Sequence, residues 1–145
     1  MASLIQMSQR VKGINLQKIY EETIVQEEET ILNLNREQLL EGKTNKGQKI
    51  KPKYKSLPYA NKKKKLNPKA GFKTPDLKLS GGLHSKLELK NKSGVFTFDT
   101  DVPYKKYVIP KYDDVLGLSL DSQKIFVNNE FIKEYNEKIR NQMQV

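Results

Sequence analysis

The feature that most constrains this chain is a dense run of lysines in its middle. Thirteen lysines lie between positions 43 and 78, where Asp76 is the only acid, so these residues carry a net charge of +12. The rest of the chain is net −2, since the whole is +10. Pro52, Pro58 and Gly71 interrupt the run, and few apolar residues are spaced to bury a face. The pattern predicts an extended, solvated basic arm over residues 43–78, with a polyanion or an acidic neighbouring subunit as its partner.

The length of the chain limits what remains for a core. The 145 residues suit a single domain, 1–145, and an arm leaves only about 110 of them to pack. A hydrophobic content of 36% beside 30% charge indicates a chain that gains stability from assembly as well as from folding. There is no cysteine, which excludes disulfides and thiolate metal sites. No stretch approaches 18 apolar residues, so we expect neither a membrane span nor a membrane partner.

The N-terminal part predicts a flexible tail and then helices. After a tail over residues 1–14, the helical region 15–42 begins at Asn15, a good N-cap residue. Apolar side chains then recur with a 3.6-residue period to about residue 33, which predicts one long helix; they are Leu16, Ile19, Tyr20, Ile24, Ile31 and Leu34. A second short helix over residues 36–41 is expected to end at Gly42.

An acidic turn interrupts the first helix. Glu27, Glu28 and Glu29 lie together, and Glu27 falls within the apolar stripe. The simpler interpretation is a solvated helix face. The alternative is that the three carboxylates face another subunit.

The C-terminal part, residues 79–145, predicts a small sheet and a helix. Leu87 and Leu89 alternate with charged residues, residues 91–94 form a turn, and Phe96 and Phe98 alternate with polar residues, which is typical of a β-hairpin with one buried face. The neighbouring pair at 108–109, ended by a proline, predicts a third, edge strand.

From position 121 onward apolar residues return to helical spacing. They are Ile125, Phe126, Phe131, Ile132, Tyr135 and Ile139, and Asn128 and Asn129 predict a break within the helix. The whole order is helix, basic arm, small antiparallel sheet and C-terminal helix. Segregated runs of this kind indicate the α+β class.

The chain lacks the residue pairs on which nucleophilic catalysis depends. His84 is the only histidine, and there is no cysteine to pair with it. We expect His84 to have a surface or packing role, with pH sensing or a polar interface contact as the alternative.

Two further patterns fall short of a metal or nucleotide site. Four acids outside the helices lack the ligand spacing of a calcium loop and fit turns and strand ends better; they are Asp99, Asp101, Asp113 and Asp114. Gly42, Lys43 and Thr44 match only part of a phosphate-binding loop. The sequence therefore predicts no enzyme, no cofactor and no metal.

The basic arm holds the candidate contact residues. Its lysines and tyrosines could combine phosphate contacts with stacking on bases, and the candidates for subunit or polyanion contact are Lys49, Lys51, Lys53, Tyr54, Lys55, Tyr59, Lys62, Lys63, Lys64, Lys65 and Lys69. The arm contains no arginine, so we expect non-specific phosphate contact or docking on an acidic protein rather than reading of base edges. Residues 59–65 also permit a brief helical turn. A solvated loop without a partner is the remaining alternative, although long loops in small domains are usually functional.

From position 27 to position 120 the chain resembles a family of small structural proteins of tailed phages. The segments that carry the resemblance are EEETILNLNREQLLEGKTNKGQKIKPKY, SLPYANKKKKLNPKAG, PDLKLSGGLHSKLELK and LGLSLDS. The family is found especially in crAss-like and other Bacteroidetes phages, and is similar in turn to Mu-type virion morphogenesis and tail-completion proteins.

Three motifs carry most of the resemblance. A "D-L-x-L-[ST]-G" element corresponds to Asp76, Leu77, Leu79 and Gly81. The loop before it matches at Asn67, Pro68 and Gly71, and a "GL[SN]" step before the last helix matches at Gly117 and Leu118. The chain departs from the family at residues 82–84, where "D-F-Y" is common, and over residues 104–115, which lack a "KYG" step.

The resemblance implies a ring-forming component of the phage neck. Such proteins have no catalytic activity, stack on the portal at the head–tail junction, and contact neighbouring subunits through a helix, a small sheet and extended loops. It implies synthesis in the host cytoplasm and a place in the virion. The implied partners are further copies of the chain, with twelve favoured over six, the portal, other neck and tail proteins, and phage DNA in the lumen.

The residues and the resemblance together suggest how a ring closes. Each basic arm would lie on the acidic face of the next subunit, Glu27, Glu28 and Glu29, because a contact between two different surfaces can close into a ring. The alternative is a small basic protein that binds nucleic acid without sequence preference.

Overall fold

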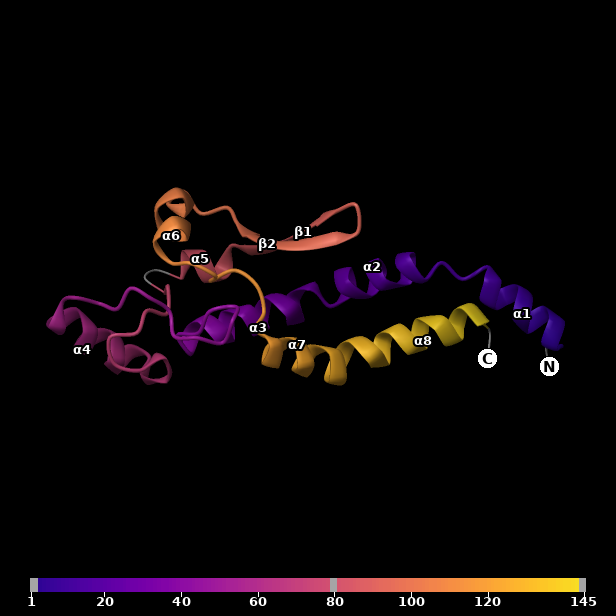
Figure 1. Ribbon diagram of the computed structural model, residues 1–145, viewed down its shortest axis with the longest axis horizontal. Coiled ribbons are helices and arrows are strands. Elements are labelled where there is room, and N and C mark those ends of the chain that lie inside the picture. Colours follow the sequence, from indigo (N-terminus) through magenta and orange to yellow (C-terminus); the bar gives the residue numbers. More distant parts are fainter. Residues whose placement is uncertain (1–2, 79–80, 144–145) are drawn as a thin grey trace.

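The computed structural model describes residues 3–78 and 81–143 and is elongated (Figure 1). Three helices follow one another along its length: α1 (Leu4–Lys12), α2 (Leu16–Gln26) and α3 (Glu28–Leu40). The last helices return beside them, with α7 (Leu120–Phe126) against α3 and α8 (Ile132–Met143) against α2 and α1. The predicted α+β class is confirmed in outline, because helices accompany one small antiparallel sheet.

The N-terminal helices differ from the prediction in their boundaries. The expected tail over residues 1–14 contains helix α1. Asn15 caps α2 as predicted, accepting a hydrogen bond from the Lys18 amide at 3.1 Å. The expected long helix breaks at Glu27, whose φ of −97° and ψ of 16° depart from helical values, and α3 then runs unbroken to Leu40.

Gly42 ends α3 as the sequence predicts. Its φ is +69°, a conformation that glycine adopts without the strain of a side chain. The amide of Gly42 bonds to the Leu39 carbonyl and that of Lys43 to the Gln38 carbonyl, so the last carbonyls of the helix are satisfied.

The predicted hairpin is confirmed. Strands β1 (Leu87–Lys92) and β2 (Val95–Thr100) pair antiparallel, with Leu89 opposite Phe98. Ser93 and Gly94 both have positive φ at the turn between them, as a tight two-residue hairpin loop requires.

The predicted third strand is wrong. Residues 108 and 109 lie in helix α6 (Lys105–Lys111), and the sheet within the described part of the chain has two strands. Tyr104, Val108 and Tyr112 recur at four-residue intervals and all pack on the core, which is a helical period. Pro110 is tolerated near the end of this short helix, where the Tyr112 amide still bonds to the Val108 carbonyl.

The expected break at Asn128 and Asn129 is a change of helix type instead. A π-helical turn, Val127–Phe131, connects α7 to α8 without interrupting the helix. Such turns insert one extra residue into a helix and shift its faces.

Two apolar clusters form the core. The larger joins α3 to the chain on either side of the sheet and contains Leu32, Leu39, Ile50, Leu83, Leu87, Val102 and Val115; the smaller contains Ile24, Ile31 and Phe126. Two buried amides on α3 fix the loop before α7. The Asn35 side chain donates to the Val115 carbonyl and accepts from the Gly117 amide. The Gln38 side chain donates to the Gly117 carbonyl and accepts from the Ser119 amide.

Residues 43–78, called the basic lobe below, are folded rather than extended. Ile50 is fully buried in the main core, and the lobe contains α4 (Leu57–Leu66) and a 3-10 turn, Pro68–Ala70. A short helix, α5 (Gly82–Ser85), follows the lobe in the sequence. The predicted extended arm is therefore wrong, while the helical turn allowed for residues 59–65 is confirmed. Three apolar residues of the lobe, Ile50, Ala60 and Ala70, are buried and let so basic a segment pack, whereas Leu57, Leu66 and Phe72 are exposed.

No helix in the described ranges 3–78 and 81–143 is long and apolar enough to cross a membrane.

Candidate polyanion-binding and assembly surfaces

A buried ion pair holds the basic lobe together. Lys63 Nζ lies 2.7 Å from Asp76 Oδ1, and the two side chains are 10% and 2% exposed. Lys63 also donates to the Lys78 carbonyl at 2.6 Å. Lys63 was a predicted contact residue, but the structure gives it an internal role, so its charge is not available to a partner.

Three donors converge on the Asp76 carboxylate. Lys63 binds Oδ1, Asn67 Nδ2 donates to Oδ2 at 2.9 Å, and the Lys78 amide donates to Oδ1 at 3.0 Å. Burial acts to raise the pKa of Asp76, but the hydrogen bonds from Lys63, Asn67 and Lys78 outweigh it and hold that pKa below its ordinary value. Asp76 is thus ionised and fully partnered at neutral pH.

His84 is a packing residue, one of the two roles expected for it. It is buried, and its Nε2 lies 2.8 Å from the Asp76 carbonyl oxygen, so Nε2 carries the proton in the neutral ring. Burial lowers the pKa of His84, while the hydrogen bond to Asp76 opposes this shift. Arg36 donates to the carbonyl of His84, which links the network to α3.

Among the motif residues that carry the resemblance, Asn67 joins the lobe to the body. Asn67 also donates to the Leu40 carbonyl at 2.7 Å, at the end of α3. Gly71, Gly81 and Gly117 have positive φ, as does Leu77. Pro68 opens the 3-10 turn, and Leu118 packs against the smaller core cluster. Leu79 lies outside the described residues.

Seven of the candidate lysines are exposed on the lobe. None has a carboxylate within 4.0 Å among residues 3–78 and 81–143; they are Lys51, Lys53, Lys55, Lys62, Lys64, Lys65 and Lys69. Lys49 is exposed too and donates to the Ala70 carbonyl at 3.1 Å. Unpaired charges of one sign on a small body create a strong local potential that attracts anions.

The predicted acidic face is partly used within the chain. Glu29 pairs with Arg36 at 2.6 Å, and Glu27 accepts a hydrogen bond from Thr30 at 3.2 Å. Glu28 lies in the first turn of α3, where a negative charge stabilises the helix. These three residues form a weaker docking surface than their sequence suggests.

A second acidic surface was missed by the sequence analysis. Glu37 on α3, Glu41 at the C-cap of α3 and Asp121 on α7 line one hollow with a volume of about 240 Å³, called the acidic hollow below; Lys43 also lines it. Glu41 is matched by Lys43 at 3.2 Å. Glu37 and Glu41 are one helical turn apart, which was visible in the sequence, but the arrival of Asp121 depends on the packing of α7 on α3.

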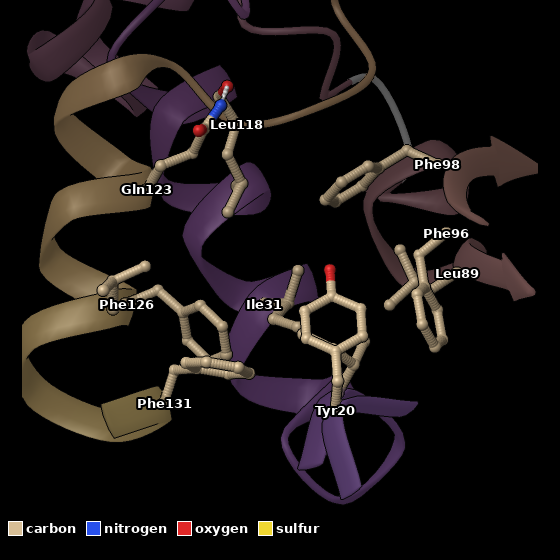
Figure 2. Close-up of a pocket in the computed structure, with 11 residues that line it drawn as sticks. Tyr20, Ile31, Leu89, Phe96, Phe98, Leu118, Gln123, Phe126 and Phe131 are labelled. Atoms are coloured by element: carbon tan, nitrogen blue, oxygen red, sulfur yellow. Dashed lines mark hydrogen bonds between the residues drawn. The ribbon is translucent and has the colours of Figure 1, made fainter. Parts of the chain in front are cut away.

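An apolar groove lies where α2 and α3, the C-terminal helices and the hairpin meet (Figure 2). Its volume is about 250 Å³, and its walls come from α2, α3, both strands and the C-terminal helices; they include Tyr20, Ile24, Ile31, Leu89, Phe96, Phe98, Leu118, Phe126 and Phe131. Tyr20 packs edge-on against Phe96 and Phe131, with ring centroids 6.2 and 5.6 Å apart. Gln123 and the Tyr20 hydroxyl are the polar groups at the groove, so its chemistry is apolar contact.

Two of the four acids outside the helices, Asp99 and Asp114, have structural partners, whereas Asp101 and Asp113 are exposed. Asp99 pairs with Lys105 at 2.6 Å and Lys90 at 2.9 Å, and the hydrogen bonds from these lysines hold the pKa of Asp99 well below its ordinary range. Asp114 pairs with Lys46 at 3.1 Å. Within residues 3–78 and 81–143 no three histidine or acidic side chains are grouped to hold a metal ion.

No protein-family model, no curated protein and no solved structure matches this chain.

Proposed function

We propose that this chain is a non-enzymatic structural protein of a phage virion, which forms a ring when the basic lobe of one copy contacts the acidic hollow of the next. The observation that carries the proposal is the separation of charge. Seven lysines of the lobe have no carboxylate within 4.0 Å in the described chain, and three carboxylates line the acidic hollow, where Glu41 alone is paired, with Lys43. Each copy therefore supplies both halves of a complementary contact.

The contact pairs two different surfaces, so it propagates from copy to copy and closes when the rotation allows. Complementary charge also speeds association and fixes its register. The location at the head–tail junction, the portal and tail partners and the preference for twelve copies rest on the family resemblance. The exposed lysines support a secondary contact with DNA passing through the ring.

A pair of charge-reversed variants tests the contact. One reverses the lobe at Lys51→Glu, Lys53→Glu and Lys55→Glu, and the other reverses the acidic hollow at Glu37→Lys, Glu41→Lys and Asp121→Lys. We expect the wild-type protein to oligomerise in light scattering at low salt, alone or with the phage's portal. Each variant alone should assemble less than wild type, because residues 51–55 and the acidic hollow then carry the same sign and repel each other.

An equimolar mixture of the two variants should assemble again. In the mixture the acidic residues 51–55 of one variant meet the basic hollow of the other, and the two unchanged surfaces also match. A third variant, Lys18→Glu, Lys92→Glu and Lys133→Glu, changes the net charge as much as the lobe variant does, at exposed positions outside the lobe and the acidic hollow, and should assemble like wild type. A mixture that stays monomeric while wild type assembles would exclude this pair of surfaces. A wild-type monomer that ignores the portal would exclude the ring.

The second candidate is a free protein that binds nucleic acid without sequence preference. The exposed lysines beside Tyr54 and Tyr59 favour it, since this combination suits phosphate contact and base stacking. A stable monomer whose DNA affinity falls steeply with salt would support this candidate over the ring.

A further inference from the structure

A pocket walled by tyrosines lies where the basic lobe meets α6. Tyr54 and Tyr59 come from the lobe, and Tyr104 and Tyr112 from the two ends of α6; Leu77, Leu83 and Val108 complete the apolar lining. Tyr54 and Tyr59 meet edge-on with ring centroids 4.9 Å apart. All four tyrosines are half-buried, so each presents part of its ring to the cavity.

The charged groups at this tyrosine pocket are positive. Lys78 and Lys111 are the basic residues of its described lining, and both are exposed. No carboxylate belongs to that lining. Lys111 Nζ lies 5.3 Å from the centre of the Tyr112 ring. The buried carboxylate of Asp76, which does not line the pocket, is paired with Lys63. An anionic group is therefore attracted to the mouth of the pocket and meets no opposing charge there.

The phenol of Tyr54 stays neutral beside such a ligand. Burial raises the pKa of Tyr54, and the charge of Asp76 raises it further. The uncharged aromatic walls offer a stacking surface for a base, and the lysines offer contacts for phosphates. These are the two elements with which proteins hold unpaired nucleic acid.

We propose that the tyrosine pocket holds one unstacked nucleobase, with Lys78 and Lys111 on the phosphates that flank it. Its volume of about 250 Å³ is below the roughly 300–1,000 Å³ of sites for drug-sized ligands, which suits a single base. Lysine contacts phosphate as a point charge, so the pocket would accept any base that stacks. The base is contributed either by a single strand or by a mononucleotide.

The test compares two fluorescent oligomers with the same number of phosphates, oligo(dT) and its abasic counterpart. Contacts of lobe lysines with phosphates are common to both oligomers, so the ratio of their affinities isolates the base. We expect the full-length wild-type protein to bind oligo(dT) about tenfold more tightly, as one stacked base contributes. Fluorescence anisotropy at fixed low salt measures both constants.

Two substitutions identify the pocket. Tyr59→Leu keeps apolar bulk but removes a stacking ring from α4, and should bring the affinity ratio close to one while leaving abasic binding unchanged. A wild-type circular dichroism spectrum and unfolding temperature show that the variant is folded. Tyr107→Leu is the control: this tyrosine lies on α6, is 68% exposed and does not line the pocket, so the ratio should stay near the wild-type value.

Competition with thymidine monophosphate distinguishes the two sources of the base. Displacement of oligo(dT) by the mononucleotide would assign the pocket to nucleotides in general, and resistance to it would assign the pocket to strands. A wild-type ratio of one, or an equal loss in the Tyr59 and Tyr107 variants, would overturn the proposal. Its failure is separable from that of the ring, which is measured as oligomer mass without nucleic acid.

Discussion

Lys62 and Lys63 are neighbours in a run of four lysines, yet only Lys63 is buried. Replacing Lys63 by Met leaves the Asp76 carboxylate without its ion pair in the interior, and we expect this to lower the free energy of unfolding by about 3–5 kcal/mol. Lys62→Met removes an exposed charge and should change it by about 0.5 kcal/mol or less. Urea unfolding at neutral pH measures both.

The double variant Lys63→Met, Asp76→Asn separates lost charge pairing from lost packing. An amide at position 76 has no charge to leave unpaired, and its oxygen can still accept from Asn67 or the Lys78 amide, so part of the stability should return. Equal effects of the Lys62 and Lys63 substitutions would contradict the buried ion pair.

His84 gives the stability a defined pH dependence. Because burial lowers its pKa in the folded state, the folded protein binds this proton less readily than the unfolded chain does. Its contribution is fully present above the unfolded pKa of about 6.5 and is lost as the pH falls toward the folded pKa. We expect stability to decrease from about pH 7.5 to about pH 5.5.

Since His84 is the only histidine, His84→Asn should flatten this dependence whatever its effect at neutral pH. Thermal unfolding at several pH values provides the slope for each protein. An equally steep slope in the variant would assign the effect to carboxylates, and an unchanged oligomer mass across the same range would exclude pH sensing in assembly.

At the scale of elements, the junction of α3 with the basic lobe depends on Gly42. A Cβ at this position would lie 2.5 Å from Thr74 Cγ2 and 3.1 Å from the Ala70 carbonyl oxygen, and φ is +69°. Gly47 also has a positive φ, +76°, but no atom within 4 Å of such a Cβ. Gly47→Ala should therefore cost only the backbone strain, about 1–2 kcal/mol.

Gly42→Ala should lose a further 1–3 kcal/mol, roughly the cost of overpacking, because the lobe must move away from α3. Denaturant unfolding of the two variants gives this difference directly. Similar losses at both glycines would mean that the contact between Gly42 and Thr74 is loose.

The hairpin could be predicted because its signals are local. Leu89 and Phe98 alternate with polar neighbours, and Ser93 and Gly94 suit the turn, so the sequence contains the whole element. Helix α6 could not be predicted from the sequence, since two adjacent apolar residues followed by Pro110 resemble the end of a strand. Its helical period shows only when Tyr104 and Tyr112 are known to share a face.

The basic lobe and the sites on it were harder to predict for the same reason. Thirteen lysines indicate a solvated segment, but its fold depends on Ile50 packing in a core formed by residues distant in sequence. It also depends on the ion pair of Lys63 with Asp76, the single acid of the segment. The acidic hollow and the tyrosine pocket each join residues about 50 to 80 positions apart. The candidate lysines were predicted correctly as exposed except for Lys63, because a surface charge needs no partner.

For the whole molecule, the packing of the lobe decides how its function can be tested. Deleting residues 43–69 would remove Ile50 from the core together with Lys63 and Asn67, so a loss of assembly would report misfolding. Surface substitutions leave the fold intact. They also separate the effect of where charge lies from the effect of how much there is.

Two variants that each lose three positive charges make this separation for nucleic acid. One carries Lys51→Gln, Lys53→Gln and Lys55→Gln in the lobe, and the other carries Lys92→Gln, Lys124→Gln and Lys133→Gln on the body. Each lysine that contacts a phosphate of a single strand contributes about 0.7 to the slope of log affinity against log salt concentration. If the lobe is the contact surface, its variant should lose about 2 from that slope and the body variant none. Equal losses would mean that the net charge of +10, and not the lobe, attracts the strand, because both variants differ from wild type by the same charge.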